Sequence, residues 1–223
     1  IDVLRRNRFR ALAGMKIGAL VHNASRAGDG TPTLELLANA PDVTLGAIFA
    51  PEHGLSSDAE GAIRDSRVGA LPIYSLFGKT RKPTPKMLRG LDAIVFDLAD
   101  VGTRFFTYMS TLRFVLEAAA QAHITVFVLD RPNPIGADRV EGPVLAPGID
   151  TFVNYHRLPV THGLTAGELA RLLNEERRIG AELRVIALEG YARDLLFGDT
   201  GLRWSAPSPN LPGPDAALLY PAI

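Results

Sequence analysis

The chain has 223 residues, 47% of them hydrophobic, so it can bury the core of one large α/β domain. Lysine plus arginine and aspartate plus glutamate number 24 each, which excludes a general attraction to nucleic acid and favours a small or neutral ligand. The absence of cysteine excludes a disulfide framework and a thiolate nucleophile.

Short runs rich in valine and isoleucine alternate with segments of helical spacing. The runs predict buried parallel strands at residues 15–21, 43–50, 93–98, 125–129 and 183–188. Helices are predicted at residues 31–39, 107–122 and 165–179, and Thr165 with Glu168 forms a capping-box pattern in the third. The β-α-β order predicts one domain over residues 1–223, with a doubly wound, mostly parallel sheet and helices on both faces.

Two long segments interrupt this alternation, at residues 130–159 and 204–221, and both are rich in proline and glycine. They exceed the ordinary length of α/β connections, so we expect them either to build a site or to pack over the fold. In a doubly wound fold the ligand crevice lies outside the carboxyl ends of the strands. Candidate site residues are therefore sought where the predicted strands end.

The second predicted strand runs directly into Pro51-Glu52-His53-Gly54. This position exposes a carboxylate and an imidazole at the carboxyl edge, and Glu52 is the first catalytic candidate. The alternative is structural, with Glu52 capping a following helix and His53 bonding to the backbone.

The third predicted strand ends near Asp97, which is followed by Asp100 and Arg104. An unpaired acid at the end of an apolar strand costs several kcal/mol, so Asp97 needs a partner. Arg104 or a ligand hydroxyl can supply one. Asp97 is thus either a catalytic candidate or half of a structural ion pair.

The fourth predicted strand ends in Asp130-Arg131-Pro132-Asn133-Pro134. The two prolines restrict the backbone here, which suits either a binding surface or a tight turn. Glu141, farther along the same segment, is a candidate second carboxylate. Glycoside hydrolysis commonly uses two carboxylates, about 5 Å apart for retention and farther apart for inversion.

His162 precedes the capped helix and is either a ligand contact or a structural histidine. Aromatic side chains that can stack on a sugar ring or fill the core are Phe105, Phe106, Tyr108, Tyr155 and Trp204. His53, Asp97 and His162 make a loose metal-site alternative, although their spacing names no metal. No phosphate-binding glycine loop follows the first strand, and neither GxSxG nor HExxH occurs.

Several long motifs resemble the NamZ-like exo-β-N-acetylmuramidases and occur in the same order along the chain. They lie at residues 49–54, 71–78, 96–108, 129–136, 140–143, 160–165 and 207–212. The resemblance implies a Rossmann-like domain followed by a smaller second domain, and a bacterial cell-wall glycosidase as the activity. We expect the site to use no cofactor and no metal. It also implies that N-acetylmuramic acid is released from the non-reducing ends of peptidoglycan fragments or muropeptides.

By this resemblance Glu52 matches the glutamate proposed as catalytic in the Pro-Glu-His-Gly motif. Glu141 or Asp97 is then expected to activate water or stabilise positive charge, and Arg131 or Arg104 to bind the lactyl carboxylate. Substrate assistance by the 2-acetamido group remains a third option. The other residues carried over as cleft residues are His53, Asn133, His162 and Asn210.

The sequence departs from the family pattern after the first strand, where it has His22-Asn23-Ala24-Ser25-Arg26 in place of a Thr-Asn-Gln/Pro-Thr-Gly-like turn. The chain also stops about where the family continues into its second domain, which we therefore expect to be absent. An exported protein is expected, with the cytoplasm as the alternative. The competing functions are a non-catalytic muropeptide-binding module and, third, a metal-dependent hydrolase.

Overall fold

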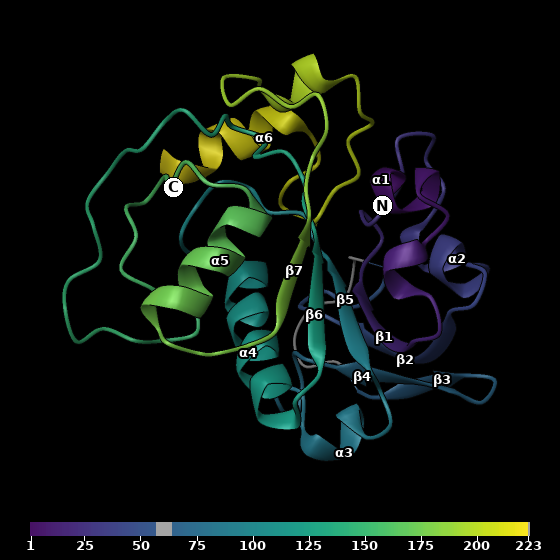
Figure 1. Cartoon of the computed structure of the whole chain (residues 1–223). Helices are drawn as coiled ribbons and strands as arrows, with labels where there is room; N and C mark the ends of the chain where they lie inside the picture. The colour runs from purple at the N-terminus through teal and green to yellow at the C-terminus, as the bar shows by residue number, and fades with distance from the viewer. Residues whose placement is uncertain (57–63, 223) are drawn as a thin grey trace.

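The computed structural model describes residues 1–56 and 64–222, in which one seven-stranded sheet forms the centre of the molecule (Figure 1). The spatial order is β3-β4-β2-β1-β5-β6-β7. All neighbours pair in parallel except β3, which pairs antiparallel with β4. The strands are β1 (Lys16–Val21), β2 (Thr44–Ala50), β3 (Ser66–Val68), β4 (Leu71–Ser75), β5 (Ala93–Asp97), β6 (Thr125–Leu129) and β7 (Leu183–Ile186).

The six parallel strands follow the Rossmann order. Across the sheet they lie in the order β4-β2-β1-β5-β6-β7. Counted along the chain, this is the order 3-2-1-4-5-6 of the Rossmann fold. The winding direction therefore reverses between β1 and β5, whose last residues Val21 and Asp97 are paired in register. Loops leaving these two strands diverge to opposite sides, and this opens a crevice at the carboxyl edge.

Helices cover both faces of the sheet, as the sequence predicts (Figure 1). One face carries α2 (Thr33–Ala38), together with apolar residues of α1 (Asp2–Arg6) and of the short 3-10 helix η1 (Arg10–Leu12). The other carries α4 (Thr107–Ala122) and α5 (Ala166–Glu176), with the short α3 (Pro85–Leu88) against α4. The remaining short helices are η2 (Phe197–Thr200), α6 (Pro214–Leu219) and η3 (Tyr220–Ala222).

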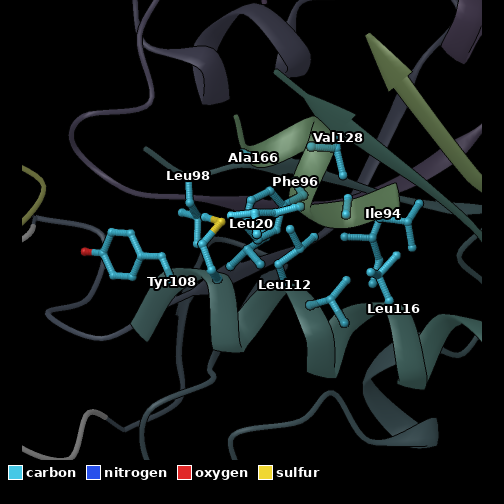
Figure 2. Packing of buried hydrophobic residues seen from close by; sticks show 14 of the residues in the cluster. Leu20, Ile94, Phe96, Leu98, Tyr108, Leu112, Leu116, Val128 and Ala166 are labelled. Carbon is cyan, nitrogen blue, oxygen red and sulfur yellow. The ribbon is translucent and has the colours of Figure 1, made fainter. Parts of the chain in front are cut away.

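The larger core lies between the sheet and α4. Leu112 and Leu116 of α4 are fully buried against Ile94 and Phe96 of β5 (Figure 2). Each such side chain contributes about 2 kcal/mol by leaving water, so this face fixes the helix firmly on the sheet. Tyr108 sits at the edge of the cluster with its hydroxyl pointing away from it (Figure 2).

The predicted elements agree with the structure except at several ends. The helix at residues 107–122 has the predicted bounds, and the Thr165–Glu168 capping box is present. The helix predicted to reach residue 179 ends at Glu176, and Arg178 then adopts a left-handed conformation with φ 51°. The helix predicted from residue 31 begins at Thr33, after Pro32. The prediction lacked β3 and β4 at the sheet edge and α6 inside the second long loop.

Among the described residues, no helix is both long and apolar enough to cross a bilayer. The long segment at residues 130–159 contains no helix or strand, and it is anchored by isolated bridges such as Glu141 to Thr161.

Candidate active site

A cavity of about 350 Å³ lies at the carboxyl edge of the sheet, where the winding direction reverses. The loops after β1, β5 and β6 line this cavity together with the segment around Trp204. Its lining residues are Asn23, Ala24, Arg26, Ala27, Gly30, Ala99, Asp100, Arg131, Pro132, Pro134, Phe197, Leu202, Arg203, Trp204, Ser205 and Pro207. The expected crevice is therefore present, and the loop of residues 22–26 contributes to it.

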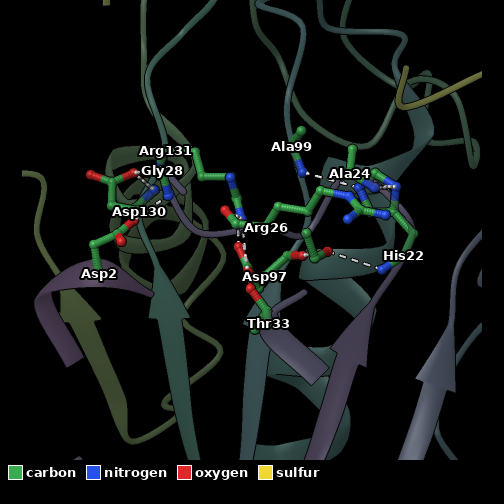
Figure 3. Close-up of polar contacts among 12 residues, drawn as sticks. Asp2, His22, Ala24, Arg26, Gly28, Thr33, Asp97, Ala99, Asp130 and Arg131 are labelled. Carbon is green, nitrogen blue, oxygen red and sulfur yellow. Dashed lines mark hydrogen bonds and ion pairs between the residues drawn. The ribbon is translucent and has the colours of Figure 1, made fainter. Parts of the chain in front are cut away.

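Arg131 and Asp97 form a two-pronged ion pair beneath this cavity (Figure 3). Arg131 Nε lies 2.5 Å from Asp97 Oδ1 and Nη2 lies 2.9 Å from Oδ2, while the Thr33 hydroxyl donates to Oδ2 at 2.5 Å. Burial of Asp97 opposes its ionisation, but the charge and hydrogen bonds of Arg131 prevail and the pKa of Asp97 is lowered. The partner of Asp97 is thus Arg131, which corrects the expectation of Arg104.

Asp97 itself is fully buried, and both carboxylate oxygens are engaged. It does not line the cavity, whereas Arg131 does. Asp97 therefore acts on a ligand only through the arginine that it holds. This arrangement corresponds to the structural ion pair considered for Asp97, with a different arginine.

Glu52 follows β2, and its carboxylate accepts a hydrogen bond from the hydroxyl of Thr107, the first residue of α4. The Tyr108 hydroxyl lies 3.2 Å from the Glu52 carbonyl oxygen and donates to the Pro207 carbonyl at 2.5 Å. Since Pro207 lines the cavity, these contacts place Glu52 behind the cavity wall, one residue from the lining. Burial and the charge of Glu52 both raise the pKa of Tyr108.

His53 and Gly54 occupy consecutive left-handed positions, with φ values of 67° and 74°. A left-handed histidine is uncommon, and such backbone outliers concentrate at functional sites. His53 lies close enough to His22 to contribute to the lowering of that residue's pKa. The turn of the Pro-Glu-His-Gly motif is therefore near the residue that follows β1.

His22 was not among the predicted site residues, yet it lies at the centre of the carboxyl edge (Figure 3). Burial is the main reason that its pKa falls to about 3, and the positive charge of Arg131 adds to the effect. Its ring packs edge-on against Tyr108, with 5.0 Å between centroids. Its position after β1, at the reversal of the sheet, is the sequence signal that identifies it.

Arg104 and Asn133 are buried and hold loops together. Arg104 Nη1 donates to the carbonyl oxygens of Pro143 at 2.9 Å and Leu158 at 2.5 Å. Asn133 donates to the Leu164 carbonyl at 3.1 Å and accepts from the Ile135 amide at 3.1 Å. Neither of them is among the residues that line the cavity.

His162 is also buried, and it contacts an acid that does line the cavity. Its Nε2 lies 3.0 Å from Oδ2 of Asp100, and its Nδ1 accepts a hydrogen bond from the Leu164 amide at 3.2 Å. The sequence placed His162 near the crevice but did not pair it with Asp100.

Glu141 and Asn210 lie apart from the main cavity. Glu141 is exposed and lines a separate hollow of about 380 Å³ with Arg139 and Leu218. Asn210 is exposed beyond Pro207. The structure therefore does not bring Glu141 and Glu52 to one cavity. Among residues 1–56 and 64–222, moreover, no group of three or more histidines and acids is arranged to hold a metal ion, so His53, Asp97 and His162 form no such site.

The fold and the cavity define a Rossmann-like α/β domain with a polar cavity at its switch point. Residues 17–215 match the family model of the exo-β-N-acetylmuramidase NamZ N-terminal domain. The chain is 42% identical over 227 residues to the peptidoglycan β-N-acetylmuramidase NamZ of Bacillus subtilis (strain 168), covering 100% of this chain and 55% of that protein. It belongs to the NamZ family.

Two solved structures, both crystal structures of DUF1343 family proteins from Bacteroides fragilis NCTC 9343, share this fold. The first superposes with a TM-score of 0.92 at 40% identity, and the second with 0.80 at 32%. They cover 98% and 97% of this chain, which in turn covers 57% of each. The chain thus spans somewhat more than half the length of the relatives that it matches.

Proposed function

We propose that this chain carries the catalytic glutamate of a glycoside hydrolase that releases N-acetylmuramic acid from the non-reducing ends of peptidoglycan fragments. Membership of the NamZ family supports the substrate class. The observation that carries the assignment is the position of Glu52, held by Thr107 and by the Tyr108 bridge beside the cavity. In this proposal, muropeptides are the ligands that bind in the cavity.

In this mechanism Glu52 acts as the acid/base group on the glycosidic oxygen. Arg131 lines the cavity and is fixed by Asp97, so its guanidinium presents a stationary positive charge to the lactyl carboxylate of the sugar. That carboxylate distinguishes N-acetylmuramic acid from N-acetylglucosamine. Asp97 serves as the positioning residue for Arg131, while the exposed Glu141 in its separate hollow takes no part.

The test is release of a chromogenic aglycone from β-linked N-acetylmuramic acid, with the β-N-acetylglucosamine conjugate as the specificity control. It is run on this chain and on a version extended to the full length of its relatives. Glu52→Gln is expected to abolish turnover in whichever form is active, because the amide cannot donate or accept the proton. The absence of turnover by both unmutated forms would sink the proposal.

One observation favours a second candidate, a non-catalytic muropeptide-binding module. Glu52 is not among the residues that line the cavity, and Asp97 is fully buried. In that case the unmutated protein binds N-acetylmuramic acid and hydrolyses no conjugate, and Glu52→Gln leaves the binding unchanged.

A further inference from the structure

Asp100 stands out among the residues of the main cavity. It is the only aspartate or glutamate among the described residues lining that cavity, where Arg26, Arg131 and Arg203 supply positive charge. It is 4% exposed, so its carboxylate is almost completely removed from bulk water. A buried carboxylate is costly unless its oxygens receive hydrogen bonds.

Only one of the two carboxylate oxygens is satisfied. Oδ2 accepts from the Gly102 amide at 3.1 Å and lies 3.0 Å from His162 Nε2. Oδ1 is buried and has no hydrogen-bond partner within the described part of the chain. Asp100 lines the cavity and one of its buried carboxylate oxygens lacks a donor, which fits a ligand donor, because buried polar groups are almost always bonded in the working state.

His162 lies against the same oxygen of Asp100 that accepts from Gly102. Because Nδ1 of His162 accepts the Leu164 amide, we assign a ring proton to Nε2, on the side of Asp100. Nε2 of His162 lies 3.0 Å from Oδ2 of Asp100 without the geometry of a hydrogen bond. The positive edge of the ring therefore faces Oδ2 as an electrostatic contact. The buried Tyr155 is also near Asp100, and its pKa is raised by burial and further by the charge of Asp100.

We propose that Asp100, backed by His162, is a substrate-contacting residue that accepts a hydrogen bond from a sugar hydroxyl or amide N–H in the main cavity. This inference rests on the proposed function and extends it to specificity. The arginines suit the anionic group of the ligand, and Asp100 suits a neutral donor on the same ring. An amino sugar acid carries both kinds of group.

The substitution Asp100→Asn tests this contact with minimal change of shape. The amide oxygen replaces Oδ2 opposite Gly102 and His162, which leaves an NH2 group in the place of Oδ1. A donor from the sugar then meets another donor. Trp204 is the only tryptophan of the chain and lines the cavity, so its fluorescence reports binding of free N-acetylmuramic acid. Affinity is expected to fall about tenfold or more, the usual effect of losing a hydrogen bond to a charged group.

The matched control is Asp42→Asn, the same change at an exposed residue before β2, at the opposite edge of the sheet. It should bind as the unmutated chain does. His162→Asn keeps an acceptor near the place of Nδ1 and removes Nε2. It should weaken binding less than Asp100→Asn, and the double variant should lose less than the sum of the two.

A ligand series separates contact from a structural role. Monodeoxy forms of N-acetylmuramic acid and a form lacking the amide N–H are titrated against the unmutated chain and Asp100→Asn. We expect one analogue to bind the unmutated chain about tenfold more weakly than N-acetylmuramic acid does. The same analogue and N-acetylmuramic acid should bind Asp100→Asn with equal affinity. This comparison is internal to each protein, so it holds even if the variant unfolds at a lower temperature.

Unchanged affinity in Asp100→Asn would overturn the inference, as would a penalty for each analogue that is the same in both proteins. Failure of the unmutated chain to bind any of these sugars would overturn it as well. Turnover of the chromogenic conjugate is measured separately. A working glycosidase whose sugar affinity is insensitive to Asp100 leaves the proposed function standing without this residue.

Discussion

The guanidinium of Arg131 lies against the carboxylate of Asp97 with two contacts, of 2.5 Å and 2.9 Å. Asp97 has no exposed surface, while the Arg131 side chain keeps 18% of its own and reaches the cavity. Asp97, which does not line the cavity, therefore fixes the position of the Arg131 guanidinium. The pair joins the end of β5 to the segment after β6, across the carboxyl edge of the sheet.

Asp97→Asn is expected to lower the free energy of unfolding by about 3 kcal/mol, because it leaves the largely buried charge of Arg131 without its partner. Urea unfolding followed by circular dichroism measures this change. Replacing both residues, as Asp97→Asn with Arg131→Gln, should cost less than the sum of the single changes. An Asp97→Asn variant as stable as Asp42→Asn would contradict the structural role of the pair.

Thr165 begins α5 with a capping box, in which its hydroxyl accepts the Glu168 amide at 3.3 Å and Glu168 accepts the Thr165 amide at 2.9 Å. The same hydroxyl donates to Asp130 at 3.0 Å. Thr165→Ala should therefore lower the free energy of unfolding by about 1 kcal/mol or somewhat more. Thermal unfolding measures it, with the exposed Thr151→Ala as the control. Equal midpoints for the two variants would show that the cap is not needed.

Local patterns explain why much of the fold could be predicted. The helix at residues 107–122 has an apolar stripe long enough to fix both ends, and Thr165 with Glu168 marks a helix start by chemistry alone. Strand β4 was not among the predicted strands, and its second residue, Pro72, is of a type that argues against a central strand. In the structure, β4 pairs with β2 only from Ile73 onward, and Pro72 faces the short edge strand β3.

The sequence predicted where in the fold the site lies, but it did not predict which side chains contact one another there. Parallel strands bring their carboxyl ends to one edge, so Glu52 and Asp97 could be placed there from sequence. Which arginine meets Asp97 depends on three-dimensional packing, since Arg131 is 34 positions away and Arg104 only seven. Glu141 lies in a segment without regular structure, where no periodicity predicts the direction of a side chain.

Thr107→Val tests how Glu52 is held. The Thr107 hydroxyl donates to the Glu52 carboxylate from the first turn of α4, and valine keeps the shape without the donor. Turnover of the chromogenic N-acetylmuramic acid conjugate is expected to fall about tenfold, because a hydrogen bond to a charged group is lost. Thr107→Ser retains the hydroxyl and should restore most of the activity. Turnover in Thr107→Val equal to that of the unmutated protein would show that Glu52 works without this contact.

The lowered pKa of His22 predicts that the free energy of unfolding falls in mild acid. Burial, then the charges of Arg131 and His53, lower the pKa of His22 to about 3 in the folded chain, with Asp97 opposing them. An unfolded histidine has a pKa of about 6.5, so the unfolded state binds more protons as the pH falls below that value. Stability is therefore retained above about pH 6.5 and falls progressively down to about pH 3.

This loss should be specific to His22. Between about pH 7 and pH 5, the unmutated chain should lose about 2 kcal/mol more unfolding free energy than His22→Gln, which cannot take up the proton. Urea unfolding at both pH values measures the difference. His123→Asn, a change at the exposed left-handed residue after α4, should keep the full pH dependence of the unmutated chain. If His22→Gln loses stability as steeply as His123→Asn does, His22 is not held neutral by its surroundings.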